Sequence, residues 1–162
     1  MRHATSKIKS GGDLAAIATL GFRGEALAAV SSVSRVEMFT KQPEDRFGTH
    51  YIIEGGEETL YEEAGCPDGT TIIIRDIFYN TPARMKFLKK DVSEANAAAA
   101  VVDRIALSHP EISFKFIRDG KQTLNTSGDG KISGAVYSVL GREFAGSLIS
   151  VDGTLDRVSV TG

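Results

Sequence analysis

Hydrophobic and polar positions alternate in two different ways along the chain, and the first part has the spacing of helices. Apolar residues recur three and four positions apart over residues 13–18, which predicts a helix that Asp13 can cap. A second helix is expected from near Gly24 to Val30. Glu25 is then in its first turn, where a negative charge suits the helix dipole.

From residue 33 the pattern changes to that of strands. Four segments are rich in Val, Ile, Thr, Tyr and Phe and are separated by Gly and Pro: 33–39, 49–54, 59–63 and 71–77. Gly55-Gly56 is a plausible tight hairpin turn between the second and the third. Because Ile72–Ile74 is apolar on both faces, we expect the fourth strand in the middle of a covered sheet.

The next segment returns to helical spacing. Thr81-Pro82 is a helix start, with threonine at the cap and proline at the first helical position. A longer helix is predicted over 92–108, and Asp91 and Glu94 have capping-box spacing at its start. Its predicted buried face consists of Ala98, Val101, Val102, Ile105 and Ala106.

The last third predicts a hairpin, a helix and two more strands. Strands over 112–117 and 121–125 are joined by Asp119-Gly120, a strong hairpin signal. A helix over 132–140 ends at Gly141, and strand-like pieces follow at 148–151 and 157–160. Because the strand connections are short, the whole order predicts a mixed α/β fold with largely antiparallel pairing.

Composition narrows the class of protein. At 162 residues the chain has the length of one domain, and 41% hydrophobic with 25% charged residues is typical of a globular protein. The net charge of −2 excludes a strongly basic nucleic-acid module, but not a local basic patch. The single Cys66 excludes an intrachain disulfide and a cysteine-based zinc site. No apolar run reaches the ~20 residues of a membrane helix, so we expect a soluble, cytoplasmic protein.

Candidate chemistry is concentrated at the glycines before the second helix. Gly21 and Gly24 allow the backbone to approach a ligand, the following helix offers unpaired N–H groups, and Arg23 adds a positive charge. Together these features can hold a phosphate. The alternative is an ordinary glycine-rich turn before a helix. The segment is not a Walker loop, because it lacks the Lys-Ser/Thr end and follows a helix.

Two further segments could contact a ligand. Residues 2–7 carry two hydroxyls and two basic groups, and Lys7 could meet a phosphate, although a solvated terminus explains them as well. Thr70 follows Gly69 at the start of a strand, where its hydroxyl could donate to a ligand. A β-branched residue at a strand start needs no such function.

Charged residues form two clusters. Arg84, Lys86, Lys89 and Lys90, with Phe87 beside them, could contact DNA or a phosphate, although a solvated helix face is an alternative. Acidic residues crowd one hairpin, where exposure to solvent explains them and their spacing suggests no metal site. The members of this acidic cluster are Glu54, Glu57, Glu58, Glu62 and Glu63.

Long strings in the sequence resemble the MutL family of DNA mismatch repair proteins. They are residues 2–8 (RHATSKI), 19–27 (TLGFRGEAL), 69–71 (GTT) and 78–88 (FYNTPARMKFL), and the resemblance extends across essentially the whole chain. It implies an ATPase of the gyrase, chaperone, histidine-kinase and MutL (GHKL, or Bergerat) type. Its expected fold is an α/β sandwich, in which helices cover one face of a mixed, largely antiparallel sheet and ATP lies between them under a mobile lid.

The resemblance also implies a set of ATP-binding residues. Residues 2–7 match the lid, the 21–25 loop matches the backbone that wraps the triphosphate, and Thr70 matches the threonine that helps to hold the adenine end. The string 80–88 resembles a structural link between the sheet and the following helix, with no catalytic role. The implied ATP-binding residues are Thr5, Ser6, Lys7, Gly21, Phe22, Arg23, Gly24, Glu25 and Thr70.

In the family's order, three functional residues precede the RHATS string that starts here at Arg2. They are a general-base glutamate, a magnesium-binding asparagine and an adenine-reading aspartate. We therefore assign no catalytic residue and no metal ligand, and expect this chain alone to be inactive as an ATPase and prone to aggregation. Residues 1–127 resemble an ATP-binding domain without its first helix and strand elements, and 128–162 the start of a second, ribosomal-protein-like (transducer-like) domain.

By resemblance, the cofactors are ATP and Mg²⁺. The implied partners are a second copy through the N-terminal region, DNA, a MutS-type mismatch recognition protein and a downstream endonuclease, with no membrane. The implied location is the bacterial cytoplasm, at the nucleoid. The residues also leave open a different class of function, a non-catalytic fragment that docks DNA or a protein partner through residues 84–90.

Overall fold

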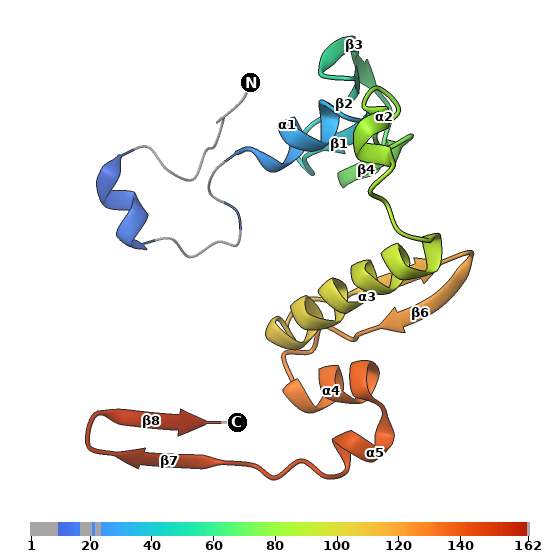
Figure 1. Cartoon of the computed structure of the whole chain (residues 1–162). Coiled ribbons are helices and arrows are strands. Elements are labelled where there is room, and N and C mark those ends of the chain that lie inside the picture. The colour runs from blue at the N-terminus through green and yellow to red at the C-terminus, as the bar shows by residue number, and fades with distance from the viewer. Residues whose placement is uncertain (1–9, 17–20, 22–23, 162) are drawn as a thin grey trace. The chain divides into compact units, whose positions relative to one another are not determined.

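The computed structural model describes residues 10–16, 21 and 24–161 (Figure 1). The chain divides into two compact units, residues 1–88 and 89–162. The predicted domain limit between 127 and 128 lies inside the second unit and stays a prediction. None of the helices in these described ranges is long and apolar enough to cross a membrane.

The first unit holds one sheet and short helices (Figure 1). A 3-10 helix, η1 (Gly11–Ala16), covers part of the first predicted helix, and Asp13 accepts a hydrogen bond from the Ser10 amide at 2.8 Å. The predicted helix near Gly24 is confirmed as α1 (Ala26–Ser31). The remaining elements are β1 (Arg35–Lys41), β2 (Gly48–Glu54), β3 (Glu57–Ala64), β4 (Gly69–Arg75) and α2 (Pro82–Met85).

The four strands pair antiparallel in the order β3-β2-β1-β4. The expectation that Ile72–Ile74 lies in the middle of a covered sheet is wrong for the described residues, because β4 is at the edge. Ile72 and Ile74 are 41% and 42% exposed. The three isoleucines divide between the two faces of the sheet. Ile73 lies on the same face as Glu37, and its two neighbours lie on the other face with Val36. An apolar run therefore did not identify a central strand.

Turn chemistry agrees with the sequence. Gly55 and Gly56 have φ angles of 59° and 93°, so both adopt the left-handed conformation that a tight β2–β3 hairpin requires. Thr81 is at the N-cap of α2 and Pro82 at its first position, as predicted. The Thr81 side chain makes no capping bond, and its Oγ1 is buried without a partner among the described residues.

The second unit begins with the long helix α3 (Asp91–Ser108), which confirms the predicted helix over 92–108. The helix over 132–140 is confirmed as α4 (Ile132–Leu140). The Asp119-Gly120 turn is confirmed by φ angles of 50° and 73°. The remaining elements are β5 (Lys115–Arg118), β6 (Lys121–Asn125), α5 (Arg142–Ala145), β7 (Asp152–Leu155) and β8 (Val158–Thr161).

Three details of the second unit differ from the predictions. The N-cap of α3 is Lys90 rather than Asp91, although Glu94 does reach back to accept a hydrogen bond from the Lys89 amide at 2.9 Å. The predicted buried face is wrong in part, since Ala106 is fully buried but Val101 is 53% exposed. The strand predicted over 148–151 is displaced to β7, because its partner β8 follows a tight turn at Asp156 (φ 54°).

Few apolar side chains are fully buried in the described residues. Among the residues whose burial is described, Val36 is the buried hydrophobic residue of the first unit, and those of the second are Ala106, Leu124, Ala135 and Val136. Large apolar side chains such as Phe87 and Ile149 are 85% exposed. Each unit therefore has a small buried core of its own among the described residues. Hydrophobic burial is the dominant favourable term in folding, so each core contributes to the stability of its unit.

Candidate functional site

The structure describes only part of the predicted ATP-binding set. Thr5, Ser6, Lys7, Phe22 and Arg23 lie outside the described residues. Gly21, Gly24, Glu25 and Thr70 lie inside them. The geometry therefore bears on the backbone before α1 and on the start of β4.

The described backbone before α1 contains a glycine in the left-handed conformation, and the phosphate-binding role of this turn stays a prediction. Gly24 has a φ of 62°, a left-handed conformation in which a side chain would be strained. Glu25 follows as the N-cap of α1, whereas the sequence predicted it in the first turn. Its carbonyl accepts a hydrogen bond from the Ala29 amide at 2.8 Å. The Glu25 side chain makes no capping bond to the first-turn amides, whose N–H groups have no acceptor within the helix.

Thr70 is the second residue of β4. Its hydroxyl is 2.8 Å from the hydroxyl of Thr40, which lies directly opposite on β1. This pair lies at the opposite end of β1 from the α1–β1 connection. The contact orients the Thr70 hydroxyl on the sheet face that also carries Ile72 and Ile74. The joint use of Gly24 and Thr70 by one ligand stays a prediction.

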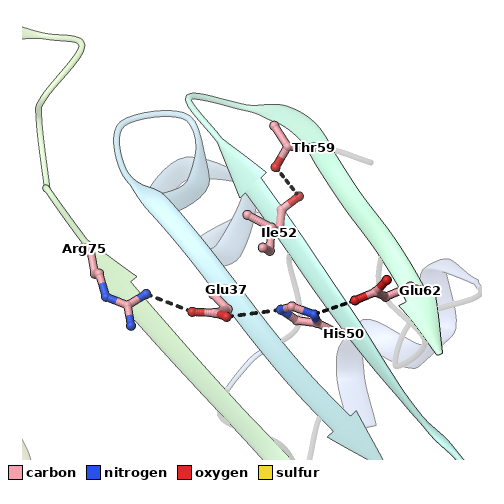
Figure 2. Close-up of polar contacts among 6 residues, drawn as sticks. All are labelled: Glu37, His50, Ile52, Thr59, Glu62 and Arg75. Atoms are coloured by element: carbon pink, nitrogen blue, oxygen red, sulfur yellow. Dashed lines mark hydrogen bonds and ion pairs between the residues drawn. The ribbon is translucent and has the colours of Figure 1, made fainter. Parts of the chain in front are cut away.

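A row of polar side chains that the sequence analysis missed crosses the other face of the sheet. Figure 2 shows it running from Arg75 on β4 through Glu37 on β1 and His50 on β2 to Glu62 on β3. Arg75 donates to Glu37 at 2.9 Å, and the two ring nitrogens of His50 lie 3.1 Å from Glu37 and 3.1 Å from Glu62. Phe39 stacks on the His50 ring with 4.2 Å between centroids.

The charges in this row, which we call the polar ladder, stabilise one another. Hydrogen bonds from Arg75 and then from His50 hold the pKa of Glu37 below its ordinary value of 4.5. Carboxylates only accept hydrogen bonds, so both contacts of His50 are complete only when both of its ring nitrogens carry a proton. The ladder therefore joins all four strands by side chains that are far apart in sequence.

A small hollow lies beside the polar ladder. It has a volume of about 140 Å³ and is lined by Arg35, Val36, Glu37, Ile52, Glu54 and Arg75. Its charges are already paired: Arg35 contacts Asp76 at 2.6 Å and Glu54 at 3.5 Å. Ligand pockets usually measure ≈ 300–1,000 Å³, so this hollow is too small for a nucleotide.

No group of three or more His, Cys, Asp or Glu residues within the described ranges could hold a metal ion. Two members of the acidic cluster contact basic side chains instead: Glu54 makes an ion pair with Arg35, and Glu62 lies 3.1 Å from His50 Nδ1. The assignment of no metal ligand to this chain stays a prediction, because part of the chain lies outside the described residues.

The basic cluster is exposed. Arg84 lies in the last turn of α2, and Lys86, Lys89 and Lys90 follow it. In the part of the chain that the structure describes, none of these four side chains makes an ion pair, and Phe87 is 85% exposed. Both a solvated surface and a DNA contact agree with this exposure, so the predicted contact stays a prediction.

Comparison with known sequences finds no matching family model, but many similar proteins. The chain is 48% identical to the DNA mismatch repair protein MutL of Agathobacter rectalis over 161 residues, which are 99% of this chain and 25% of that protein. MutL of Thermoanaerobacter pseudethanolicus is 48% identical over 92% of this chain, and MutL of Symbiobacterium thermophilum 43% over 99%. The chain spans about a quarter of the length of these relatives.

Solved structures agree with the sequence comparison. The Aquifex aeolicus MutL ATPase domain complexed with ADP matches 82% of this chain with a TM-score of 0.68 and 28% identity, and the chain covers 52% of it. The N-terminal domain of a DNA repair protein matches 94% of this chain with a TM-score of 0.68, at 24% identity. The predicted fold class is confirmed: the chain has the mixed α/β architecture, with antiparallel sheets, of the GHKL-type ATPase domains.

Proposed function

Because the chain belongs to the MutL family of DNA mismatch repair proteins, we propose that its residues form part of the ATP-binding site of a mismatch-repair ATPase. The likeness to the A. aeolicus ATPase domain that was solved with ADP carries the proposal. The left-handed Gly24 before α1 supports it, because backbone amides can then approach a phosphate without a side chain in the way.

Each predicted residue has a role in this proposal. The amides of residues 21–25 surround the phosphates and Arg23 adds positive charge, while Thr5, Ser6 and Lys7 belong to a lid that closes over them. Thr70 takes part in holding the adenine end, and its contact with Thr40 keeps its hydroxyl oriented. No residue is proposed for Mg²⁺, because the described residues offer no suitable group.

In the whole protein, we propose that ATP acts as a conformational switch. A nucleotide that contacts both lid and core binds the closed state better, so it shifts the population toward that state. The closed state then favours pairing of two N-terminal regions and couples mismatch recognition, by a MutS-type partner on DNA, to strand incision by an endonuclease. We place this activity in the bacterial cytoplasm, at the nucleoid.

We further propose that the 162 residues alone do not hydrolyse ATP. By the family resemblance, the general base and the magnesium ligand come before Arg2, and without a positioned base a water molecule is not activated. Phosphate release at background level in the presence of Mg²⁺ is the expected result. Turnover above background that is abolished by Arg23→Ala would contradict this proposal.

Nucleotide protection of Lys7 tests the proposed binding site. The chain is treated with an amine-acylating reagent at increasing ADP concentration, and the modified lysines are measured by mass spectrometry. We expect Lys7 to be protected in a saturable way, while Lys121 on the β5–β6 hairpin reacts at an unchanged rate. Arg23→Ala should remove the protection, and the matched control Arg157→Ala, which replaces an exposed arginine of the second unit, should retain it.

Two results would count against the binding site. One is equal reactivity of Lys7 with and without ADP. The other is protection that survives in Arg23→Ala, because the nucleotide would then bind without the loop of residues 21–25.

A second candidate function is docking of DNA or a protein partner by residues 84–90, whose four basic side chains are exposed and accessible to a partner. Salt-dependent DNA binding that ignores ATP, and that is lost when the four basic residues are reversed in charge, would favour it. Unchanged DNA binding in that variant would exclude it. Reversal of Lys121, an exposed lysine elsewhere, is the control.

A further inference from the structure

The connection between α1 and β1 is held in place by two other parts of the first unit, the β2–β3 turn and the segment that follows β4. Three successive carbonyls, those of Ser32, Val33 and Ser34, accept hydrogen bonds from groups far away in sequence. The donors are the Asn80 side-chain Nδ2 to Ser32 at 2.9 Å, the Phe78 amide to Val33 at 2.6 Å and the Gly55 amide to Ser34 at 3.1 Å.

The segment that supplies two of these donors, Asp76–Asn80, has an unusual backbone. Asp76 and Phe78 have φ angles of 55° and 67°, in the left-handed region that side chains rarely adopt. For a bulky residue such as Phe78 this conformation is a true outlier with an energetic cost. Such strain persists only where surrounding contacts enforce it. The hydrogen bond from the Phe78 amide to the Val33 carbonyl is one of these contacts.

Side chains fasten the same segment to the start of β1. Arg35 donates to Asp76 at 2.6 Å, and its guanidinium lies 4.5 Å above the ring of Tyr79. Gly55 completes the contact from the β2–β3 turn. A Cβ there would come within 2.9 Å of the Tyr79 hydroxyl and 3.1 Å of Asn80 Nδ2, and the φ of 59° at Gly55 would strain any side chain, so both features favour glycine.

These contacts matter for α1 because the helix is short. Its six residues are too few to be stable as an isolated helix in water, so its place depends on what holds its ends. The backbone of Ser32–Ser34 continues directly from α1. A group that holds these carbonyls therefore also limits the movement of the Gly24–Glu25 turn at the other end of the helix.

We propose that Asp76–Asn80 is a clamp that sets the position of α1 and thereby of the phosphate-binding turn, with Asn80 as a positioning residue that acts through Ser32. This inference rests on the proposed nucleotide site for its functional meaning. It assigns a reason to the Phe-Tyr-Asn part of the 78–88 string. That part does not contact the ligand; it fixes the element that does.

Hydrogen exchange in the full 162-residue chain tests the clamp without any nucleotide. In Asn80→Ala the Ser32 carbonyl loses its donor. A neutral hydrogen bond has a net value of about 1 kcal/mol, so amides of residues 26–34 should exchange about fivefold faster. Amides of β2 and β3 should keep their rates. The matched control is Asn96→Ala, which removes an exposed asparagine that accepts from Arg118 at 2.7 Å in the second unit, and it should leave residues 26–34 unchanged.

Nucleotide protection then connects the clamp to the site. In Asn80→Ala, half-maximal protection of Lys7 should need about fivefold more ADP, in proportion to the exchange effect. Asn96→Ala should need the same ADP concentration as the original chain. If the original chain shows no protection at all, the proposed nucleotide site fails, while the exchange measurement still decides the clamp.

A second variant covers the case in which Asn80→Ala does not fold. Asp76→Asn keeps a residue that tolerates the left-handed conformation and removes only the charge that faces Arg35. It should raise exchange in the same residues, 26–34, by about twofold. Unchanged exchange there, or an equal rise across β1–β4, would overturn the clamp, because the segment would then support the unit only in general.

Discussion

The two faces of the four-stranded sheet differ in how well their side chains are paired or buried by the described residues. On one face, the polar ladder joins Arg75, Glu37, His50 and Glu62 by contacts between neighbouring strands (Figure 2). On the other, Val36 is buried, but Ile72 and Ile74 remain more than 40% exposed. The side chains of the polar face therefore find their partners within the four strands, whereas the apolar face keeps exposed surface whose burial would be favourable.

The strand register explains why both faces exist in the same few residues. Glu37 lies between Ile52 and Ile73, and its neighbour Val36 lies between Ile53 and Ile74. Because successive side chains point to opposite faces, one strand contributes to the ladder and to the core at alternate positions. Three variants separate these contributions, in order of decreasing effect.

Removing the buried side chain should have the largest effect. Val36→Ala deletes two buried methyl groups and should lower the free energy of unfolding by about 2 kcal/mol. Urea titration followed by tyrosine fluorescence measures it, because three of the four tyrosines (Tyr51, Tyr61 and Tyr79) lie in the first unit. The control Val151→Ala, at a position that is 52% exposed, should change the value by less than about 0.5 kcal/mol. Equal effects of the two variants would contradict the assignment of the core.

Breaking the polar ladder should have a smaller effect that depends on pH. Glu37→Gln leaves Arg75 and His50 without their shared carboxylate and should lower stability at pH 7 by less than Val36→Ala does. The folded-state pKa of Glu37 is depressed, so its contribution is present above its ordinary value of 4.5 and is lost as pH falls through the depressed value.

The pH dependence gives the measurement for the ladder. Urea midpoints between pH 6 and pH 3 should fall more steeply in the original chain than in Glu37→Gln, so the two curves should converge at low pH. Glu63→Gln, at an exposed position of β3, is the control and should follow the original curve. Parallel curves for the original chain and Glu37→Gln would show that the ladder contributes nothing.

The smallest effect on stability is expected at the exposed isoleucines. Ile72→Thr with Ile74→Thr keeps β-branched residues in β4 and should change the free energy of unfolding by about 1 kcal/mol or less. It should nevertheless reduce self-association in sedimentation velocity, because exposed apolar surface promotes contact between copies. Ile73→Thr lies on the polar face and is the control. Self-association that responds equally to both changes would remove the distinction between the faces.

Local signals in the sequence were sufficient for many elements. The turns at Gly55-Gly56 and Asp119-Gly120 were predictable because these residues themselves adopt left-handed backbone angles. The helix α4 ends where a glycine follows it. Such features depend on a few neighbouring residues, so propensity and spacing contain the information.

Features that depend on distant pairing were not predictable. Glu37 and Arg75 are 38 positions apart and Asn80 and Ser32 are 48 apart, so neither contact follows from spacing before the register is known. The edge position of β4 was missed for the same reason, because an apolar run does not determine which strands lie beside it. Thr5–Lys7, Phe22 and Arg23 lie outside the described residues, and their roles remain predictions.

The most direct test of the central claim, that the turn before α1 binds a nucleotide phosphate, is an ADP titration followed by amide chemical shifts of the 162-residue chain. We predict saturable shifts of the Gly21, Gly24 and Glu25 amides, with no shift of Gly120 or Gly153 in the hairpins of the second unit. Absence of any shift at Gly24 at saturating ADP, or shifts confined to other residues, would contradict the claim.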